Sequence, residues 1–343
     1  MGALSVATIR RSAKWWLGIL LSVLCLVLAL RGVALADVLV ALARTDYGLV
    51  AVAVVTVVLT GIAKTARWRL LFHPNQAQLR FEGLFGALMI GQMFNLAIPA
   101  RLGELVRAYT VGATEGVSKS LALGTIVVEK LFDMLMTLFC LLLLFLLIYL
   151  PSWVWELGFS LAIGTGAVLV VALAMTYQRD RILQGVAALL RLLPPLAGRQ
   201  FYLQIESALK GLEVLRHVQA SLGIWGWSLL IWVLAVTTNY VVFLAMRMAL
   251  PLSAALFLLV VLQIGGAVPS SPGKVGVFQY LCVLVLSLFS VERSIALGCS
   301  LVLYLVVFLL PLLLGTFFLS RSSMAFHALK SGGAVVVPGE DVR

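Results

Sequence analysis

Apolar residues in this chain gather in long uninterrupted runs. Six of these runs approach the length of about 20 residues that a helix needs to cross the hydrocarbon core of a bilayer. They occupy residues 15–30, 47–63, 131–150, 157–177, 223–246 and 294–319. Two shorter apolar runs, at 83–98 and 254–268, are each followed by a segment rich in proline and glycine. The pattern predicts an all-α integral membrane protein, built as a polytopic helix bundle with six full spans.

The two short runs end in segments with the same spacing. Residues 99–103 read Pro-Ala-Arg-Leu-Gly, and residues 269–273 read Pro-Ser-Ser-Pro-Gly. Proline and glycine interrupt helices, because proline lacks an N–H donor and glycine adopts backbone conformations closed to other residues. Each short run is therefore predicted to turn back as a re-entrant hairpin, one over 83–117 and one over 254–290.

The distribution of basic residues gives the orientation. Cytoplasmic loops carry an excess of Lys and Arg. With two hairpins, sixteen basic residues fall on the side of the loops 1–14, 64–82, 178–222 and 320–343, and four fall on the other side. Both termini are therefore predicted to be cytoplasmic. If both short runs crossed fully instead, the most basic loop would lie outside.

The hairpin arrangement exposes an internal repeat. Residues 1–150 hold two spans, a hairpin and a span, and residues 157–319 hold the same order, beginning from the opposite side. Such inverted repeats with broken helices recur in secondary transporters. The insertion at 178–222 has apolar residues at helical spacing, which predicts two amphipathic helices on the cytoplasmic face, lying either in the headgroup region or under the bundle. The tail 320–343 is predicted to be disordered.

The first apolar run has a second interpretation. Basic residues precede it, and residues 34–36 read Ala-Leu-Ala, which resembles a signal-peptidase site. Retention as a span and cleavage as a signal peptide both stay open.

Composition narrows the class of function. Hydrophobic residues make up 62% of the chain and charged residues 11%, against about 25% charged in soluble domains. This excludes a soluble enzyme or nucleic-acid-binding domain. The four cysteines lie in apolar runs and the three histidines are far apart, so neither a disulfide nor a metal site is expected. The sequence also lacks the glycine-rich ATP-binding loop, and no cofactor is expected.

Charged residues inside the apolar region are the candidates for function. A charge at the centre of a membrane helix costs about 2.5–3.5 kcal/mol on insertion scales, so charges found there usually have a role. They gather at the two breaks and at the start of the third long run: Arg101, Glu104, Arg107, Glu129, Lys130, Asp133 and Lys274. The one surplus positive charge suits a lipid phosphate, which the arginine fork binds well. Two alternatives stay open: an ion-pair network that locks the hairpins to the long span, and a proton relay through the carboxylates.

The same residues form motifs of a known family. The pattern N-x3-P-x-R-x-G-E-x2-R is met by Asn95, Pro99, Arg101, Gly103, Glu104 and Arg107. The pattern E-[KR]-x2-D follows at Glu129, Lys130 and Asp133. The pattern P-x2-P-G-x2-G-x2-[EQ] is met by Pro269, Pro272, Gly273, Gly276 and Gln279. Over residues 10–320 the chain resembles the flippase-like family named for the transmembrane region of lysylphosphatidylglycerol synthetase, as a stand-alone member without a synthetase domain.

The resemblance carries expectations about function. It implies a membrane lipid translocase, of flippase or scramblase type, in a prokaryotic cell (inner) membrane. The lipid would be an anionic or zwitterionic phospholipid, a glycolipid or a polyprenyl-phosphate lipid, and this region would not be an enzyme. Two alternatives are an intramembrane enzyme that acts on lipid headgroups and a non-transporting partner of a membrane glycosyltransferase or other lipid-modifying enzyme.

The resemblance and the charges together give the candidate site. The predicted substrate-binding residues are Asn95, Pro99, Arg101, Glu104, Arg107, Lys130, Pro269, Gly273, Lys274 and Gln279. The predicted ion-pair or proton-relay residues are Glu104, Glu129 and Asp133. The chain departs from the family at Lys274, where glycine is common, at Gln279, where glutamate is common, and at 302–305, where many members carry an arginine.

Overall fold

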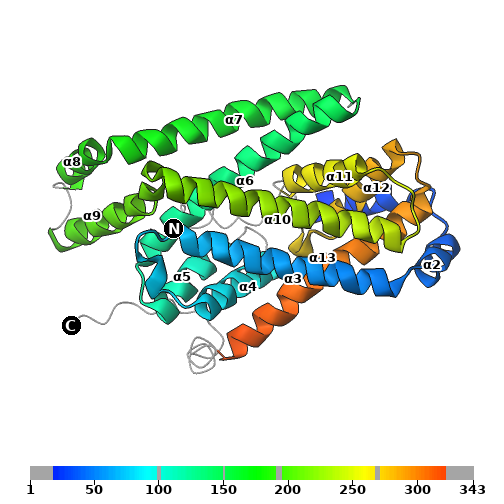
Figure 1. Cartoon of the computed structure of the whole chain (residues 1–343), viewed down its shortest axis with the longest axis horizontal. Coiled ribbons are helices and arrows are strands. Elements are labelled where there is room, and N and C mark those ends of the chain that lie inside the picture. The colour runs from blue at the N-terminus through cyan, green and yellow to red at the C-terminus, as the bar shows by residue number, and fades with distance from the viewer. Residues whose placement is uncertain (1–17, 99–101, 150, 191–194, 267–270, 322–343) are drawn as a thin grey trace, which may run out of the picture.

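The computed structural model describes residues 18–98, 102–149, 151–190, 195–266 and 271–321. In these ranges all regular structure is helical, which confirms the predicted all-α class (Figure 1).

Long apolar helices form the frame of the described part of the chain. Five of them are long and apolar enough to cross a membrane: α3 (Tyr47–Leu70), α6 (Lys119–Leu147), α7 (Ser152–Tyr177), α10 (Val218–Ala245) and α13 (Arg293–Arg321). A sixth is formed if the helix Gly18–Leu30 and α2 (Leu35–Ala43), which meet at a bend of 80°, count as one span. These helices coincide with the six long apolar runs, so the polytopic bundle is confirmed.

Two helices are longer than the apolar runs that predicted them. Helix α3 continues to Leu70, so that Lys64 and Arg67 lie inside it, and their placement in a loop at 64–82 was wrong. Helix α6 begins at Lys119 instead of residue 131, so Glu129, which precedes the run, is also helical. A span that is ended at its first charged residue is too short here, because carboxylates on the neighbouring helix α6 neutralise Arg67.

The first Pro/Gly break joins two helices that pack against each other. Helix α4 (Phe81–Ala97) precedes the break and α5 (Gly103–Glu115) follows it. Their outer ends are tied together, since the Arg80 N–H donates to Glu115 Oε2 at 2.9 Å, so the pair is antiparallel. At 1.5 Å per residue the arms span about 26 and 20 Å, short of the roughly 30 Å hydrocarbon core. These lengths support a re-entrant hairpin.

The second break has the same form. Helix α11 (Leu252–Gly265) and α12 (Val277–Leu288) pack together, and the segment between them holds the 3₁₀ turn η3 (Pro272–Lys274). Gly273 and Gly276 have φ angles of +72° and +88°, in the region that favours glycine. The turn η3 contacts α4 of the first hairpin, so the two hairpins meet inside the bundle.

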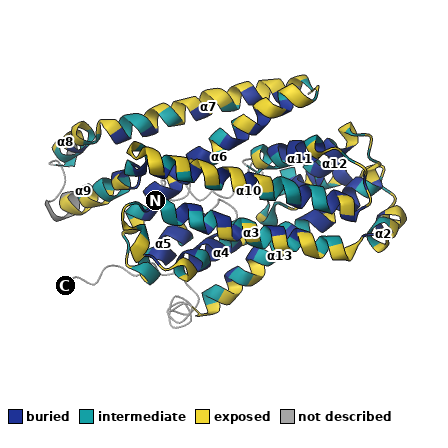
Figure 2. Cartoon of the chain, in the orientation of Figure 1, coloured by how far each residue is buried: buried dark blue, intermediate teal, exposed yellow. Residues whose placement is uncertain are grey.

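The insertion between α7 and α10 is helical, as predicted. It contains α8 (Arg179–Leu190), α9 (Pro195–Lys210) and the 3₁₀ turn η2 (Glu213–Arg216). Apolar side chains of the insertion, including Leu183, Leu209 and Leu212, are buried in one core cluster with residues of α3 and α6. The insertion therefore packs against the bundle, and its position relative to the headgroup region stays a prediction. Helix α7 by contrast lies along the outside of the bundle, exposed over most of its surface (Figure 2).

The described elements follow the same order in both halves. A span, a second span, a hairpin and a third span precede α7, and α7, α10, the α11–α12 hairpin and α13 repeat that order. The inverted orientation of the halves, the cytoplasmic placement of the termini and the disorder of the tail stay predictions. The residues after Arg321 lie outside the described ranges.

Candidate functional site

A buried ion pair fixes the first hairpin to the long helix α6. Both terminal nitrogens of Arg107 on α5 bond to Glu129 on α6, with Nη1–Oε1 and Nη2–Oε2 distances of 3.1 and 2.7 Å. The two side chains are only 3% and 5% exposed. The Arg107 guanidinium also lies over the Trp68 ring of α3, 3.6 Å from its centroid. Bidentate pairing and a cation–π contact together define one orientation for this arginine.

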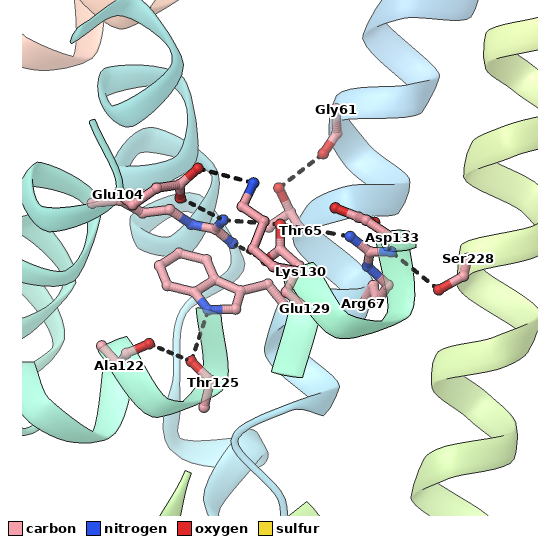
Figure 3. A network of polar contacts seen from close by, with 12 residues as sticks. Gly61, Thr65, Arg67, Glu104, Ala122, Thr125, Glu129, Lys130, Asp133 and Ser228 are labelled. Atoms are coloured by element: carbon pink, nitrogen blue, oxygen red, sulfur yellow. Dashed lines mark hydrogen bonds and ion pairs between the residues drawn. The ribbon is translucent and has the colours of Figure 1, made fainter. Parts of the chain in front are cut away.

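A second buried arginine, Arg67 on α3, completes the network. Its Nη1 donates to Asp133 Oδ1 at 2.7 Å and to Ser228 Oγ at 3.0 Å, and its Nη2 lies 3.5 Å from Glu129 Oε1. The side chain is 0% exposed and joins α3 to α6 and α10 (Figure 3). The sequence interpretation missed Arg67 because it stopped the span at residue 63. The continuing apolar residues at 68 and 70–72 were a signal that the helix runs on.

The third ion pair of this network lies nearer its edge. Lys130 Nζ is 2.9 Å from Glu104 Oε1, and the two side chains are 48% and 26% exposed. Glu104 Oε2 is also 3.9 Å from Arg107 Nη1. Each of the three carboxylates in the network therefore has a cationic partner within 4 Å. These contacts support the ion-pair alternative for the charged cluster.

The side chains of Asn95 and Gln279 accept hydrogen bonds from backbone N–H groups at the two breaks. Asn95 Oδ1 accepts the N–H of Gly103 at 2.9 Å, which bridges the first break. Gln279 Oε1 accepts the N–H of Gly276 at 2.7 Å, which caps α12. Tyr304, in the part of the last span where many family members carry an arginine, donates its hydroxyl to the Gly273 carbonyl at 2.8 Å. It thereby ties the second break to α13.

Three predicted site residues, Pro99, Arg101 and Pro269, lie outside the described residues. The other predicted residues separate into two groups. One group belongs to the ion-pair network and the first break: Asn95, Glu104, Arg107, Glu129, Lys130 and Asp133. The other belongs to the second break: Gly273, Lys274 and Gln279.

A cavity of about 260 Å³ lies where the two halves meet. Its walls come from α3, α4, α6 and from α10 to α13. The charged and amide side chains on its walls are Lys64, Gln92, Asp133, Asn239, Gln263 and Lys274. Each half contributes three of these residues. The remaining walls are mainly apolar, with Val58, Leu310 and Leu314 among them.

The two lysines of the cavity have different surroundings. Lys64 stands one helical turn before Arg67, and in the described part of the chain it makes no hydrogen bond or ion pair. Lys274 Nζ lies at the carboxyl end of α11. If Gly266 carried a Cβ atom, that atom would lie 3.3 Å from Lys274 Nζ and 2.9 Å from the Leu262 carbonyl oxygen. The negative end of a helix dipole stabilises a cation there. Among the residues that the structure describes, Asp133 alone both lines the cavity and belongs to the ion-pair network.

The charges of the network and cavity leave a positive surplus. Among the described residues five cations face three carboxylates: Lys64, Arg67, Arg107, Lys130 and Lys274 against Glu104, Glu129 and Asp133. The sequence predicted a surplus of one, counting Arg101 and omitting Lys64 and Arg67. The described residues give a surplus of two.

Comparison with known proteins matches the chain, over residues 15–315, to the family described as Lysylphosphatidylglycerol synthase TM region. The chain belongs to this family. It is 34% identical to Glycosyltransferase AglD of Haloferax volcanii over 118 residues, which are 34% of the chain and 19% of that protein. It is 22% identical to the UPF0104 membrane protein MJ1595 of Methanocaldococcus jannaschii, covering 87% of the chain and 91% of that protein. No solved structure matches it.

The family match confirms the resemblance that the motifs indicated. The second relative is itself described as a membrane protein and is covered almost end to end, which agrees with a stand-alone member of the family. The chain is therefore a multi-pass membrane protein linked by its relatives to lipid or glycolipid metabolism.

Proposed function

We propose that the chain moves a phosphate-bearing lipid between the leaflets of a prokaryotic cell membrane and leaves the lipid chemically unchanged. The observation that carries this proposal is the cavity at the junction of the two halves, where Lys64 of the first half and Lys274 of the second line one space. Family membership and two archaeal relatives support the membrane and the link to lipids.

The composition of the cavity suits an amphipathic ligand. A charged headgroup cannot cross hydrocarbon without a large desolvation cost. The lysines and amides of the cavity replace part of its hydration, while Val58, Leu310 and Leu314 offer an apolar surface to the lipid chains. A lipid can then place its headgroup inside the protein and keep its tails against apolar walls. This lowers the barrier to crossing without any chemical step.

Movement of the two hairpins relative to each other would change access to the cavity. In transporters built from repeats, alternating access arises when one bundle rocks against another around a fixed site. Here η3 of the second hairpin contacts α4 of the first beside the cavity. Movement of one hairpin against the other would open the cavity first to one leaflet and then to the other. The Arg107–Glu129 pair keeps the first hairpin attached to α6 throughout.

The hydroxyls and the carboxylate of the cavity support transport over catalysis. Catalysis on a headgroup would need a nucleophile next to an available base. The hydroxyls of Thr60 and Thr238, which line the cavity, donate to the Thr56 and Leu234 carbonyls of their own helices. The Asp133 carboxylate is held by Arg67 at 2.7 Å. We therefore assign these groups to binding and structure.

The test is lipid movement in liposomes that contain the purified full chain. A tail-labelled fluorescent phosphatidylglycerol in the inner leaflet should become accessible to an external quencher faster than in empty liposomes. Lys64→Gln should slow this movement at least about tenfold, and Lys210→Gln, at an exposed lysine on α9, should leave it unchanged. Headgroup turnover without movement would overturn the proposal in favour of an enzyme.

A second candidate is a non-transporting partner of a membrane glycosyltransferase. The similarity to part of Glycosyltransferase AglD favours it, although the match covers 19% of that protein. Under this alternative the chain would co-purify with a glycosyltransferase whose activity depends on it. Liposomes with the chain alone would then show no lipid movement.

A further inference from the structure

We propose that the cavity selects lipid headgroups of net negative charge and discriminates against headgroups that carry an ammonium group, whether zwitterionic or cationic. The inference takes from the proposed function only that the ligand is a lipid. It concerns which headgroup binds, so it can be measured without transport.

The first argument is that the carboxylates are already neutralised. An ammonium group in a headgroup needs an uncompensated carboxylate or several neutral acceptors. Asp133, the carboxylate on the cavity wall, is bound by Arg67 at 2.7 Å. Behind it, Glu129 is bound by Arg107 at 2.7 Å and Glu104 by Lys130 at 2.9 Å. An incoming ammonium would have to compete with a bound guanidinium or ammonium for each of them.

The second argument is the position of the two lysines on the cavity wall. Lys64 makes no hydrogen bond or ion pair with any residue in the described ranges, and it faces the cavity. Lys274 brings a second ammonium to the same cavity from the other half. A lysine ammonium is a compact charge on a flexible stem that suits phosphate oxygens. A phosphate in the cavity would be attracted by both lysines.

The third argument is the apolar lining. Phe85, Phe278 and Leu314 are among the residues that surround the polar groups. In such surroundings charges interact more strongly than in water, and unmatched charges are penalised more. A phosphate alone gains the full attraction of the lysines. A phosphate linked to its own ammonium gains less, because that ammonium is repelled by the same lysines.

The consequence for this chain differs from what the family description suggests. Lysylphosphatidylglycerol carries a phosphate and two amino groups, and is therefore cationic. By the charge arrangement above it should be a poor ligand here. Phosphatidylglycerol or phosphatidic acid, which carry phosphate without an amine, should be good ones.

The experiment is native mass spectrometry of the purified full chain with five lipids that share dioleoyl chains: phosphatidic acid, phosphatidylglycerol, phosphatidylethanolamine, phosphatidylcholine and lysylphosphatidylglycerol. We expect the first two to bind at least about tenfold more tightly than the other three. Lys64→Gln should reduce the preference for phosphatidylglycerol over phosphatidylcholine to about threefold or less. Lys64→Arg, which keeps the charge, should preserve the preference, and so should Lys210→Gln.

The outcomes separate this inference from the proposed function. Equal binding of all five lipids, or tighter binding of lysylphosphatidylglycerol, overturns the selectivity even if liposomes show transport. An unchanged preference in Lys64→Gln also overturns it. If that variant does not purify as a folded monodisperse protein, Lys274→Gln is measured in its place, with the same reduced preference expected. Selective binding without lipid movement rejects the proposed function and leaves the selectivity standing.

Discussion

Arg107 and Glu129 meet through two hydrogen bonds, of 3.1 and 2.7 Å, between the hairpin helix α5 and the long helix α6. Both side chains are almost entirely shielded from solvent. Removing one partner of such a pair leaves an uncompensated charge in a medium of low dielectric constant. The pair thus makes the position of the first hairpin depend on α6.

The first prediction concerns the stability that this pair provides. Arg107→Met should lower the free energy of unfolding by about 3–5 kcal/mol, because Glu129 then lacks its bidentate partner. The double variant Arg107→Met/Glu129→Leu should recover part of that loss, because neither charge remains. Thermal unfolding in detergent, monitored by size-exclusion chromatography after heating, measures the stability of the single and the double variant. Equal loss in the single and the double variant would contradict a coupled pair.

A second prediction concerns the glycine of the first motif. A Cβ on Gly103 would lie 2.0 Å from the Gly91 carbonyl oxygen and 2.5 Å from the Asn95 side chain. Gly103→Ala should therefore force α4 and α5 apart and sharply reduce the yield of folded protein. The matched control is Gly164→Ala on α7, where a Cβ meets nothing within 4 Å. That control should fold normally and gain up to about 1 kcal/mol from helix propensity.

Gly103 and Lys64 illustrate how far the sequence determines the site. Gly103 was identified by its motif, and the structure adds the reason: two backbones cross at a distance that excludes a side chain. Lys64 and Arg67 were assigned to a loop, because a charge after an apolar run looks like the end of a span. What makes them helical is tertiary: Asp133 and Glu129 on α6 neutralise Arg67. A single sequence does not show which charges will face one another.

The broad fold was easier to predict than the site. Long apolar runs are decided by local composition, so all six predicted spans correspond to helices. The cavity depends on which helices pack together, and its six charged and amide side chains come from six different elements. Of these, the sequence assigned Lys274 to substrate binding and Asp133 to an ion pair or proton relay. Lys64 could be assigned only once α3 was seen to pass residue 63.

A third prediction tests the orientation of the chain. The start of α6 lies beside α9, since Ser118 Oγ and Ser207 Oγ are 2.7 Å apart. Cysteines introduced at Lys119 and Lys210, both exposed, should therefore be labelled from the same side by a membrane-impermeant thiol reagent, and that side should be cytoplasmic. A cysteine at Arg247, exposed at the other end of α10, should be labelled from outside. The four native cysteines are buried, which keeps the background low.

Labelling of Lys119 from outside and Lys210 from inside would contradict the structure itself. Labelling of both from outside would keep the packing and reverse the predicted topology. Only the second result would reject the prediction that the basic loops face the cytoplasm.

The last prediction separates the ion-pair network from the cavity by two measurements that should change in opposite directions. Asp133 belongs to both, because it lines the cavity and binds Arg67 at 2.7 Å. Asp133→Asn should lower thermal stability, because Arg67 loses a carboxylate partner while still buried. The same variant should increase the binding preference for phosphatidylglycerol over phosphatidylcholine, because the described cavity wall loses its carboxylate and becomes more positive.

Glu129→Gln is the matched control, since Glu129 binds two arginines outside the cavity wall. It should lower stability at least as much and change the preference far less. If Asp133→Asn weakened phosphatidylglycerol binding in protein that remains folded, Asp133 would be orienting the headgroup and not opposing its charge.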